Sequence, residues 1–217
     1  MVNQEQFNYQ ELFQVLNLKD KQQQLKNLND MIKRNINNTK LFPFATNLVF
    51  GDGNINADIL FIGEAPGKNE DKLGKPFVGS SGKILTDLLD RISIKREDVY
   101  ITNIVKYRPF NNQDPTPEEK IIFLPYLICQ ILIIQPKLIV TLGRHSFNSL
   151  LPNRLIKDYH GKILRIDLKE LEINIFKKIS LNTVFNLLPI YHPAATIYNR
   201  NLKDVLVKDF LRIPYLI

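Results

Sequence analysis

Three residues that could do chemistry each follow or end an apolar run of the sequence. Glu64 ends the run 57–64, Asn103 lies near the end of the run 98–105, and His192 follows the run that begins at 182. An imidazole can donate a hydrogen bond to a developing oxyanion, and an amide can both donate to and accept from the edge of a flat base. Each residue alone also suits a structural role in a turn, so the three indicate a site only if the fold brings them together. His145 and His160 have no comparable setting, and we interpret them as surface or helix residues.

The loop from residue 63 to residue 82 holds five of the nine glycines of the chain. Glycine lets a ligand approach the main chain closely, and the pair Ser80–Ser81, flanked by glycines before a predicted helix, can present N–H groups and hydroxyls to a phosphate. The spacing matches neither a Walker loop nor a dinucleotide-binding fingerprint. Phe77 in the same loop could stack on a base, or it could tuck beneath the loop. Lys106 and Arg108, in the loop after Asn103, are natural phosphate contacts.

The charge of the chain suits a polyanionic partner. Its 217 residues include 29 Lys and Arg against 22 Asp and Glu, a formal charge of +7. The chain is also rich in Ile, Asn and Lys, a mix that an AT-biased genome produces without selection for binding. Charge alone is therefore weak support for nucleic-acid binding.

Cysteine content and apolar runs bear on where the protein works. The single cysteine, Cys129, excludes an internal disulfide and lies in an apolar run typical of a buried thiol. The first residues lack the basic and apolar regions of a secretory signal, and the apolar runs fall short of the ~18–20 residues that span a bilayer. We therefore expect an intracellular protein with no membrane partner.

Strands and helices are expected to alternate along most of the chain. Apolar runs predict strands over 57–64, 98–105, 137–143, 160–167 and 182–193. Periodicity and end signals predict helices after residue 82, from 117, over 144–151 and over 201–213, and a helical arm within 4–36. This alternation predicts an α/β fold with a mostly parallel sheet and helices on both faces. Ligands of such sheets bind beyond the carboxyl ends of the strands, where the polar loops would converge.

Four stretches of the sequence together resemble the family 4 uracil-DNA glycosylases. They are "GEAPGKNEDKLGKPFVGSSGKIL", "VYITNIVKYRPFNNQDPTPEE", "PKLIVTLG" and "YHPAA", and the resemblance covers roughly residues 36–210. It implies an α/β/α sandwich around a central four-stranded, mostly parallel sheet. We accordingly expect a helical N-terminal arm, 1–35, and a uracil-DNA glycosylase-like domain, 36–217. The resemblance also implies hydrolysis of the N-glycosidic bond of uracil in DNA, with the base flipped out and an abasic site left for base excision repair.

The resemblance assigns roles to individual positions. Glu64 and His192 are the expected catalytic residues, Phe77 matches the aromatic that stacks on uracil, and Asn103 matches the amide that distinguishes uracil from cytosine. Ala65 stands where other uracil glycosylase families place a water-activating Asp. The expected contacts to the nucleotide backbone and its phosphates are Gly63, Ala65, Gly67, Gly79, Ser80, Ser81, Gly82, Lys106 and Arg108. The expected DNA-inserting residues are Pro193, Ala194 and Ala195.

One departure from the family concerns its four-iron four-sulfur cluster. The four cysteine positions of the family fall here near Ile36, Thr39, Tyr107 and Phe123, and one cysteine in the whole chain cannot hold a cubane. We therefore predict no cofactor and no metal, with packing in place of the cluster.

Three interpretations remain open at this stage. The first is a monomeric enzyme that acts on uracil-containing DNA in the bacterial cytosol or nucleoid. The second is a non-catalytic DNA-binding scaffold with the same fold, which would have no need to keep the pocket residues. The third is a glycosylase for another deaminated or mismatched base.

Overall fold

The computed structural model describes residues 9–37, 42–171 and 182–217. Its sheet has six strands in the order β1-β3-β2-β4-β6-β5. The four central strands are parallel: β3 (Tyr100–Asn103), β2 (Ile59–Gly63), β4 (Leu138–Leu142) and β6 (Val184–Ile190). Two short edge strands, β1 (Asp52–Gly53) and β5 (Leu164–Asp167), pair antiparallel to their neighbours. The predicted α/β class is confirmed, and the expected four-stranded sheet is extended by one strand at each edge.

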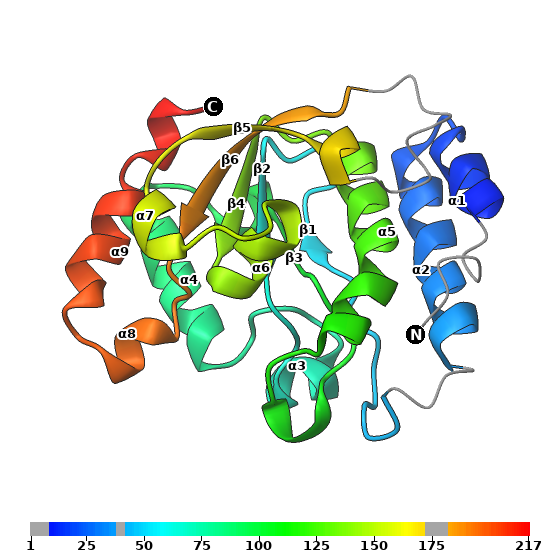
Figure 1. Ribbon diagram of the computed structural model, residues 1–217, viewed down its shortest axis with the longest axis horizontal. Coiled ribbons are helices and arrows are strands. Elements are labelled where there is room, and N and C mark those ends of the chain that lie inside the picture. Colours follow the sequence, from blue (N-terminus) through cyan, green and yellow to red (C-terminus); the bar gives the residue numbers. More distant parts are fainter. Residues whose placement is uncertain (1–8, 38–41, 172–181) are drawn as a thin grey trace.

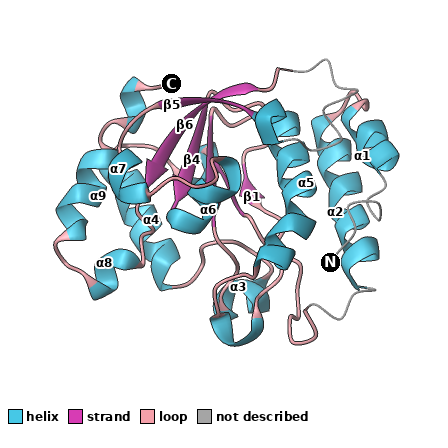
Figure 2. Ribbon diagram, in the orientation of Figure 1, coloured by secondary structure: helices cyan, strands magenta, loops and turns pink. Residues whose placement is uncertain are grey.

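Helices cover both faces of this sheet (Figure 1; Figure 2). One face carries α5 (Pro117–Ile134), with α1 (Tyr9–Leu16) and α2 (Lys21–Asn37) outside it, and the other carries α4 (Ser80–Arg91) and α9 (Leu202–Phe210). The remaining short elements are listed here: α3 (Lys68–Leu73), α6 (Arg144–Leu150), α7 (Ile156–Tyr159), α8 (Ala195–Tyr198), and the 3-10 turns Arg96–Asp98, Phe110–Asn112, Leu168–Leu171 and Ile213–Tyr215.

The alternation of side chains along β2 divides the core into two parts. Leu60 and Ile62 join the cluster under α5, whereas Ile59 and Phe61 join the cluster under α4 and α9. Successive residues of a strand point to opposite faces, so a strand buried on both faces reads as one continuous apolar run. All five residues of β2 are buried, which is why this strand could be predicted from an apolar run of the sequence.

The N-terminal segment forms two helices, α1 and α2. They meet at residues 17–20, where Asp20 Oδ1 accepts a hydrogen bond from the N–H of Gln23 at 2.7 Å and starts α2. Leu12, Leu28 and Ile32 are buried in the same core as α5. This cover explains why α5 is apolar on nearly all sides. The division into an arm, 1–35, and a domain, 36–217, remains a prediction.

The parallel strands β3, β2, β4 and β6 all end on the same side of the sheet, where the loop 63–82 and the segments after Asn103 and His192 begin. Across the part of the chain that the structure describes, no helix is both long enough and apolar enough to span a bilayer.

Candidate active site

The ends of β2 and β3 bring a buried amide and an aromatic ring together at Gly63. Gly63 pairs in register with Asn103, and a Cβ built on Gly63 would lie 2.3 Å from Asn103 Oδ1 and 2.5 Å from Phe77 Cε2. The bare main chain of Gly63 therefore borders both side chains. Asn103 is 2% exposed, and its Oδ1 has no hydrogen-bond partner among the described residues. A buried acceptor without a partner is costly, so this oxygen indicates a place for a ligand that donates a hydrogen bond.

The loop around Phe77 holds that ring in place. Phe77 has a φ of 52°, a conformation that costs energy for a residue with a side chain. Arg96 Nη2 donates to the carbonyl of Pro76 at 2.8 Å, and a Cβ on Gly82 would lie 1.8 Å from the carbonyl oxygen of Phe77. Glycine at position 82 thus lets the first turn of α4 pack directly on the main chain of Phe77.

The His192 ring lies beside the Phe77 ring, with 5.9 Å between the ring centroids. The N–H of Ala194 donates to His192 Nδ1 at 3.2 Å, which leaves the proton of a neutral ring on Nε2. Burial, with a smaller contribution from the charge of His145, lowers the pKa of His192 to about 4. The imidazole is therefore neutral at physiological pH and can act as a hydrogen-bond donor through Nε2.

Glu64 lies beside a group of charged residues that the sequence interpretation did not assign to the site. Its carboxylate is 3.9 Å from His145 Nε2, and that nitrogen is 3.0 Å from Asp114 Oδ2. Lys120 Nζ is 2.9 Å from His145 Nδ1, and Arg144 Nη2 donates to Asp114 at 2.8 Å. His145 is a residue of helix α6, in line with its interpretation as a surface or helix residue, but it also lies beside Glu64, which the sequence interpretation did not foresee. Its position two residues after the predicted strand 137–143 was the signal that could have found it.

The same residues set the pKa of Glu64. Burial raises the pKa to about 7, and repulsion from Asp114 adds to the rise, whereas Lys120 and Arg144 act in the opposite direction. The ligand atoms of Glu64, Asp114 and His145 lie within 4.8 Å of one another, which is close enough to hold a cation. Lys120 and Arg144 already supply the positive charge at this point, so the arrangement is better described as an ion-pair network.

The start of α4 has the form expected of a phosphate-binding helix end, with one change. The first-turn N–H groups of Ser80, Ser81 and Gly82 have no intrahelical acceptor, as at any helix N-terminus. The N–H of Gly79, however, donates to Glu70 Oε1 at 2.7 Å, and the N–H of Val78 donates to the same oxygen at 2.9 Å. The main-chain donor of Gly79 is therefore already used inside the protein, contrary to our expectation.

Lys106 is not a phosphate contact. It is fully buried, and Nζ donates to Thr102 Oγ1 at 2.6 Å, to the carbonyl of Asn103 at 2.7 Å, and to Gln130 Oε1. The prediction is wrong because the chain turns inward after β3, and three acceptors replace water around the amine. Arg108 is partly exposed, with Nε donating to Asn112 Oδ1 at 2.7 Å.

The segment after His192 forms the short helix α8. Pro193 is buried and Ala194 and Ala195 are half-buried, whereas Ile197 is 52% exposed and Tyr198 is 90% exposed. This burial argues against Pro193 as a residue that inserts into DNA, and it places the exposed apolar surface of the segment two to five residues later.

Comparison with known proteins agrees with this arrangement. The model of the uracil DNA glycosylase superfamily matches residues 50–212. The type-4 uracil-DNA glycosylase of Sulfurisphaera tokodaii is 47% identical over 180 residues, which cover 80% of this chain and 76% of that protein. Those of Archaeoglobus fulgidus and Thermotoga maritima are 41% and 39% identical over 192 and 166 residues, covering 87% and 76% of this chain and 92% and 80% of theirs. The chain belongs to the uracil DNA glycosylase superfamily. The family expected from the sequence motifs is confirmed.

The positions that match the iron–sulfur cysteines of family 4 do not fit a cluster in this member of the superfamily. Ile36, Tyr107 and Phe123 are buried, and Thr39 lies outside the described residues. The Phe42 ring lies 5.6 Å from the centroids of both Tyr107 and Phe123, which are 6.3 Å from each other. Apolar and aromatic side chains supply no thiolate, and the chain has a single cysteine. An aromatic cluster therefore occupies this place in the fold.

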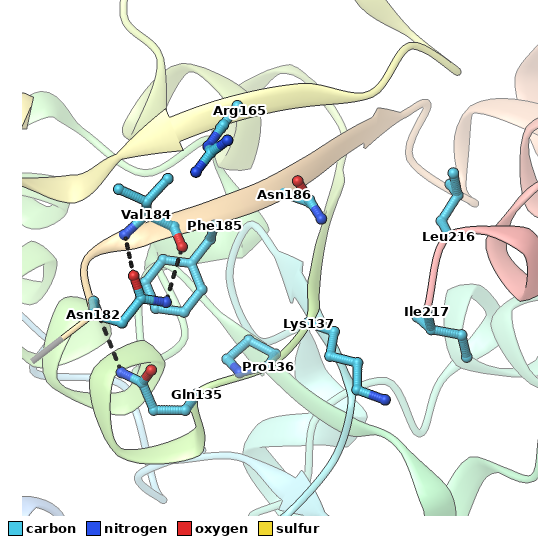
Figure 3. Close-up of a pocket in the computed structure, with 10 residues that line it drawn as sticks. All are labelled: Gln135, Pro136, Lys137, Arg165, Asn182, Val184, Phe185, Asn186, Leu216 and Ile217. Carbon is cyan, nitrogen blue, oxygen red and sulfur yellow. Dashed lines mark hydrogen bonds between the residues drawn. The ribbon is translucent and has the colours of Figure 1, made fainter.

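A separate hollow of about 560 Å³ lies at the opposite end of the sheet from the candidate active site (Figure 3). Its walls are the segment before β4 and the start of β6, with Gln135 donating to the carbonyl of Asn182 and the Asn182 amide bonded to the main chain of Val184. These polar groups satisfy one another, so the hollow lacks the unpaired acceptor that distinguishes the pocket at Asn103.

Proposed function

We propose that the protein excises uracil from DNA by hydrolysing the N-glycosidic bond, as a monofunctional glycosylase of base excision repair. The observation that carries the proposal is the buried Oδ1 of Asn103, which lies close to Gly63 and has no hydrogen-bond partner among the described residues, with the Phe77 ring next to the same glycine. Uracil has an N3–H that can donate to this oxygen, and it is flat enough to stack on Phe77. The relatives that share most of the chain are named type-4 uracil-DNA glycosylases, which supports the same activity here.

A base must leave the duplex before it can reach this pocket. Extrusion costs a few kcal/mol and is cheapest for a mispaired base such as uracil opposite guanine. We infer that the first turn of α4, at Ser80 and Ser81, holds a phosphate of the extruded nucleotide. Arg108 and the main chain of Gly63, Ala65 and Gly67 would line the path of the strand. The segment 194–198 would fill the space that the base has left.

Bond cleavage then places negative charge on the base and positive charge on the sugar. The C1′–N1 bond breaks with its electron pair going to N1, and the charge spreads to O2 of uracil. His192, held neutral with its proton on Nε2, donates a hydrogen bond to that oxygen. Glu64 in its ionised form stabilises the sugar cation. A water molecule adds to C1′ and releases a proton, which Glu64 or bulk water accepts.

We also propose that the enzyme works as a monomer in the bacterial cytosol or nucleoid, without a metal or cluster in the reaction. The buried apolar and aromatic side chains of Ile36, Tyr107 and Phe123, which offer no ligand to iron, support the absence of a cluster.

The test is uracil release from a labelled duplex with one uracil, followed by alkaline cleavage of abasic sites. We expect cleavage that depends on uracil and falls about 10²–10³-fold in His192→Ala, the usual effect of losing one oxyanion donor. Asn103→Asp, which can donate or accept differently at the same position, should cleave at cytosine. A folded protein that binds this DNA without releasing uracil would instead be a scaffold, and release of a different base would change the substrate.

A further inference from the structure

The buried amine of Lys106 lies directly behind the residue proposed to recognise uracil. Lysine is rarely buried without partners, because removing an ammonium or amine from water is costly. Here Nζ makes three hydrogen bonds, to Thr102 Oγ1, to the carbonyl of Asn103 and to Gln130 Oε1, while burial lowers the pKa of the amine well below its usual value. Nothing in the proposed reaction uses this amine, so its burial calls for another explanation.

The acceptors of Lys106 connect the end of β3 with helix α5 and with the segment before β1. Thr102 Oγ1 donates to the carbonyl of Phe50 at 2.7 Å, and Gln130 Nε2 donates to the same carbonyl at 3.0 Å. The main-chain carbonyl of Lys106 itself accepts from the N–H of Val49 at 2.8 Å. Lys106 is therefore the centre of a buried polar network, and one branch of this network ends on Asn103.

The branch to Asn103 fixes its main chain on the side away from the pocket. β2 fixes the other side, because the N–H of Ile104 donates to the carbonyl of Gly63 at 3.0 Å. The Oδ1 of the Asn103 side chain has no partner among the described residues, so it has no hydrogen bond of its own to hold the amide. The place of the amide therefore depends on where the main chain holds the Cα atom of Asn103.

We propose that Lys106 is a positioning residue that holds the main chain of Asn103, so that its side-chain amide stays in place to meet the N3 position of the bound base. The proposal rests on the proposed function, since it concerns the selectivity of the same pocket. An asparagine amide presents an acceptor on one side and donors on the other, and a turned amide would suit N3 of cytosine instead of N3–H of uracil. Loss of the bond from Lys106 should therefore lower both the rate on uracil and the preference for uracil over cytosine.

Two variants of Lys106 and one control separate this role from a general effect on stability. Lys106→Met removes every donor at similar volume, and Lys106→Gln keeps a shorter donor in case the first variant does not fold. Gln130→Met disrupts the same buried network from α5 but leaves the bond between Lys106 and the carbonyl of Asn103. Circular dichroism and thermal melting establish which variants are folded at the assay temperature.

The experiment measures single-turnover release of uracil and of cytosine from otherwise identical single-stranded DNA, with the affinity for uracil-free DNA measured in parallel. For Lys106→Met we expect a uracil rate about 10- to 100-fold lower, the usual size of a misplaced contact, with a smaller uracil-to-cytosine ratio and unchanged DNA affinity. Lys106→Gln should fall between this variant and the wild type. Gln130→Met should melt at a lower temperature yet keep the wild-type ratio.

Three outcomes would overturn the inference. A folded Lys106 variant with the wild-type rate and ratio would show that Asn103 does not need the amine. If Gln130→Met loses as much preference for uracil over cytosine as Lys106→Met, the selectivity depends on the whole buried network and not on the bond from Lys106 to Asn103 in particular. If the wild type itself releases no uracil, the proposed function fails, and this inference fails with it. The first two outcomes leave the proposed function intact.

Discussion

At the scale of single residues, the surroundings of Glu64 determine the pH at which the site can work. The pKa of this carboxyl is raised to about 7, first by burial and then by Asp114. The acid is therefore largely protonated below pH 7 and ionised above it, and only the ionised form stabilises a sugar cation. The pKa of His192 is about 4, so the imidazole is already neutral wherever Glu64 titrates. The plot of the reaction rate against pH should therefore have a single ascending limb.

We predict that the single-turnover rate of uracil release rises with pH, with a midpoint near 7, when measured from about pH 5 to 9. Asp114→Asn removes a repulsive charge while Lys120 and Arg144 remain, so the midpoint should move to lower pH. Glu64→Gln should give a low rate with no such limb. An unmoved midpoint in Asp114→Asn would contradict this account of the pKa of Glu64.

A second prediction at this scale concerns the bare main chain of Gly63. Gly63→Ala places a methyl group 2.3 Å from Asn103 Oδ1 and 2.5 Å from Phe77, in the space where the base is expected to lie. Uracil release should be abolished or fall by at least about 100-fold, because a misplaced contact of ~1 Å already costs that much. Leu18→Ala is the control, since Leu18 is 38% exposed and lies between α1 and α2, outside the proposed site. Comparable losses in the two variants, measured at equal folding, would argue against a pocket at Gly63.

At the scale of secondary structure, the strands could be predicted from the sequence where every residue of the strand is buried. The strands β2 and β4 are buried at every position, so each reads as an unbroken apolar run. The helix α3 was not predicted, because "KNEDKL" has no apolar periodicity, and it forms within what was expected to be a loop. Its sequence carries Glu70, whose role depends on a contact with a main chain eight and nine residues away. Such a contact cannot be predicted from the residues next to Glu70 in the sequence.

The contacts of Lys106 and His145 could not be predicted from the sequence for a similar physical reason. Lysine is normally solvated, so nothing in the sequence around Lys106 announces three buried acceptors supplied by β3 and α5. His145 depends on Lys120 and Asp114, which lie 25 and 31 residues away in the chain. The side chains on the ends of β2 and β3 were predictable because parallel strands bring their carboxyl ends to one edge of the sheet.

The contact between Glu70 of α3 and the main chain of residues 78–79 leads to a prediction for helix α3 and the loop that follows it. Glu70→Ala leaves the N–H groups of Val78 and Gly79 without their acceptor, and the free energy of unfolding should fall by about 1–3 kcal/mol. The loop that carries Phe77 should loosen, and the rate of uracil release should fall with it. Glu70→Gln keeps an oxygen acceptor and should retain most of both. Lys72→Ala, an exposed substitution on the same helix, is the control for helix α3. Chemical denaturation and single-turnover kinetics measure the two effects, and a stable but inactive Glu70→Gln would point to a direct role of the charge.

At the scale of the whole molecule, α1 and α2 are joined to the sheet by packing through α5. Buried residues of α1, α2 and α5 form one cluster with one face of the sheet, and the aromatic cluster of Phe42, Tyr107 and Phe123 lies where the family resemblance places an iron–sulfur cluster. Aromatic side chains bury a large apolar area and gain further from their ring contacts. This region should therefore be stabilised by burial alone.

The last prediction tests that account with Phe123→Ala. Phe123 is fully buried and contacts the rings of Phe42, Tyr107 and Tyr126, so truncation should lower the free energy of unfolding by about 3–5 kcal/mol. Ile121→Ala, at a position of α5 that is 47% exposed, should change it by less than about 0.5 kcal/mol. Below the melting temperature of the variant, the rate of uracil release should stay close to that of the wild type, because Tyr107 and Phe123 belong to the core under α5, whereas Phe77 belongs to the core on the other face of the sheet. Metal analysis should find no stoichiometric iron, and an iron chelator should leave the melting of the wild type unchanged. A chelator-sensitive melting transition would instead mean that the chain stabilises this region with a metal bound by residues other than cysteine.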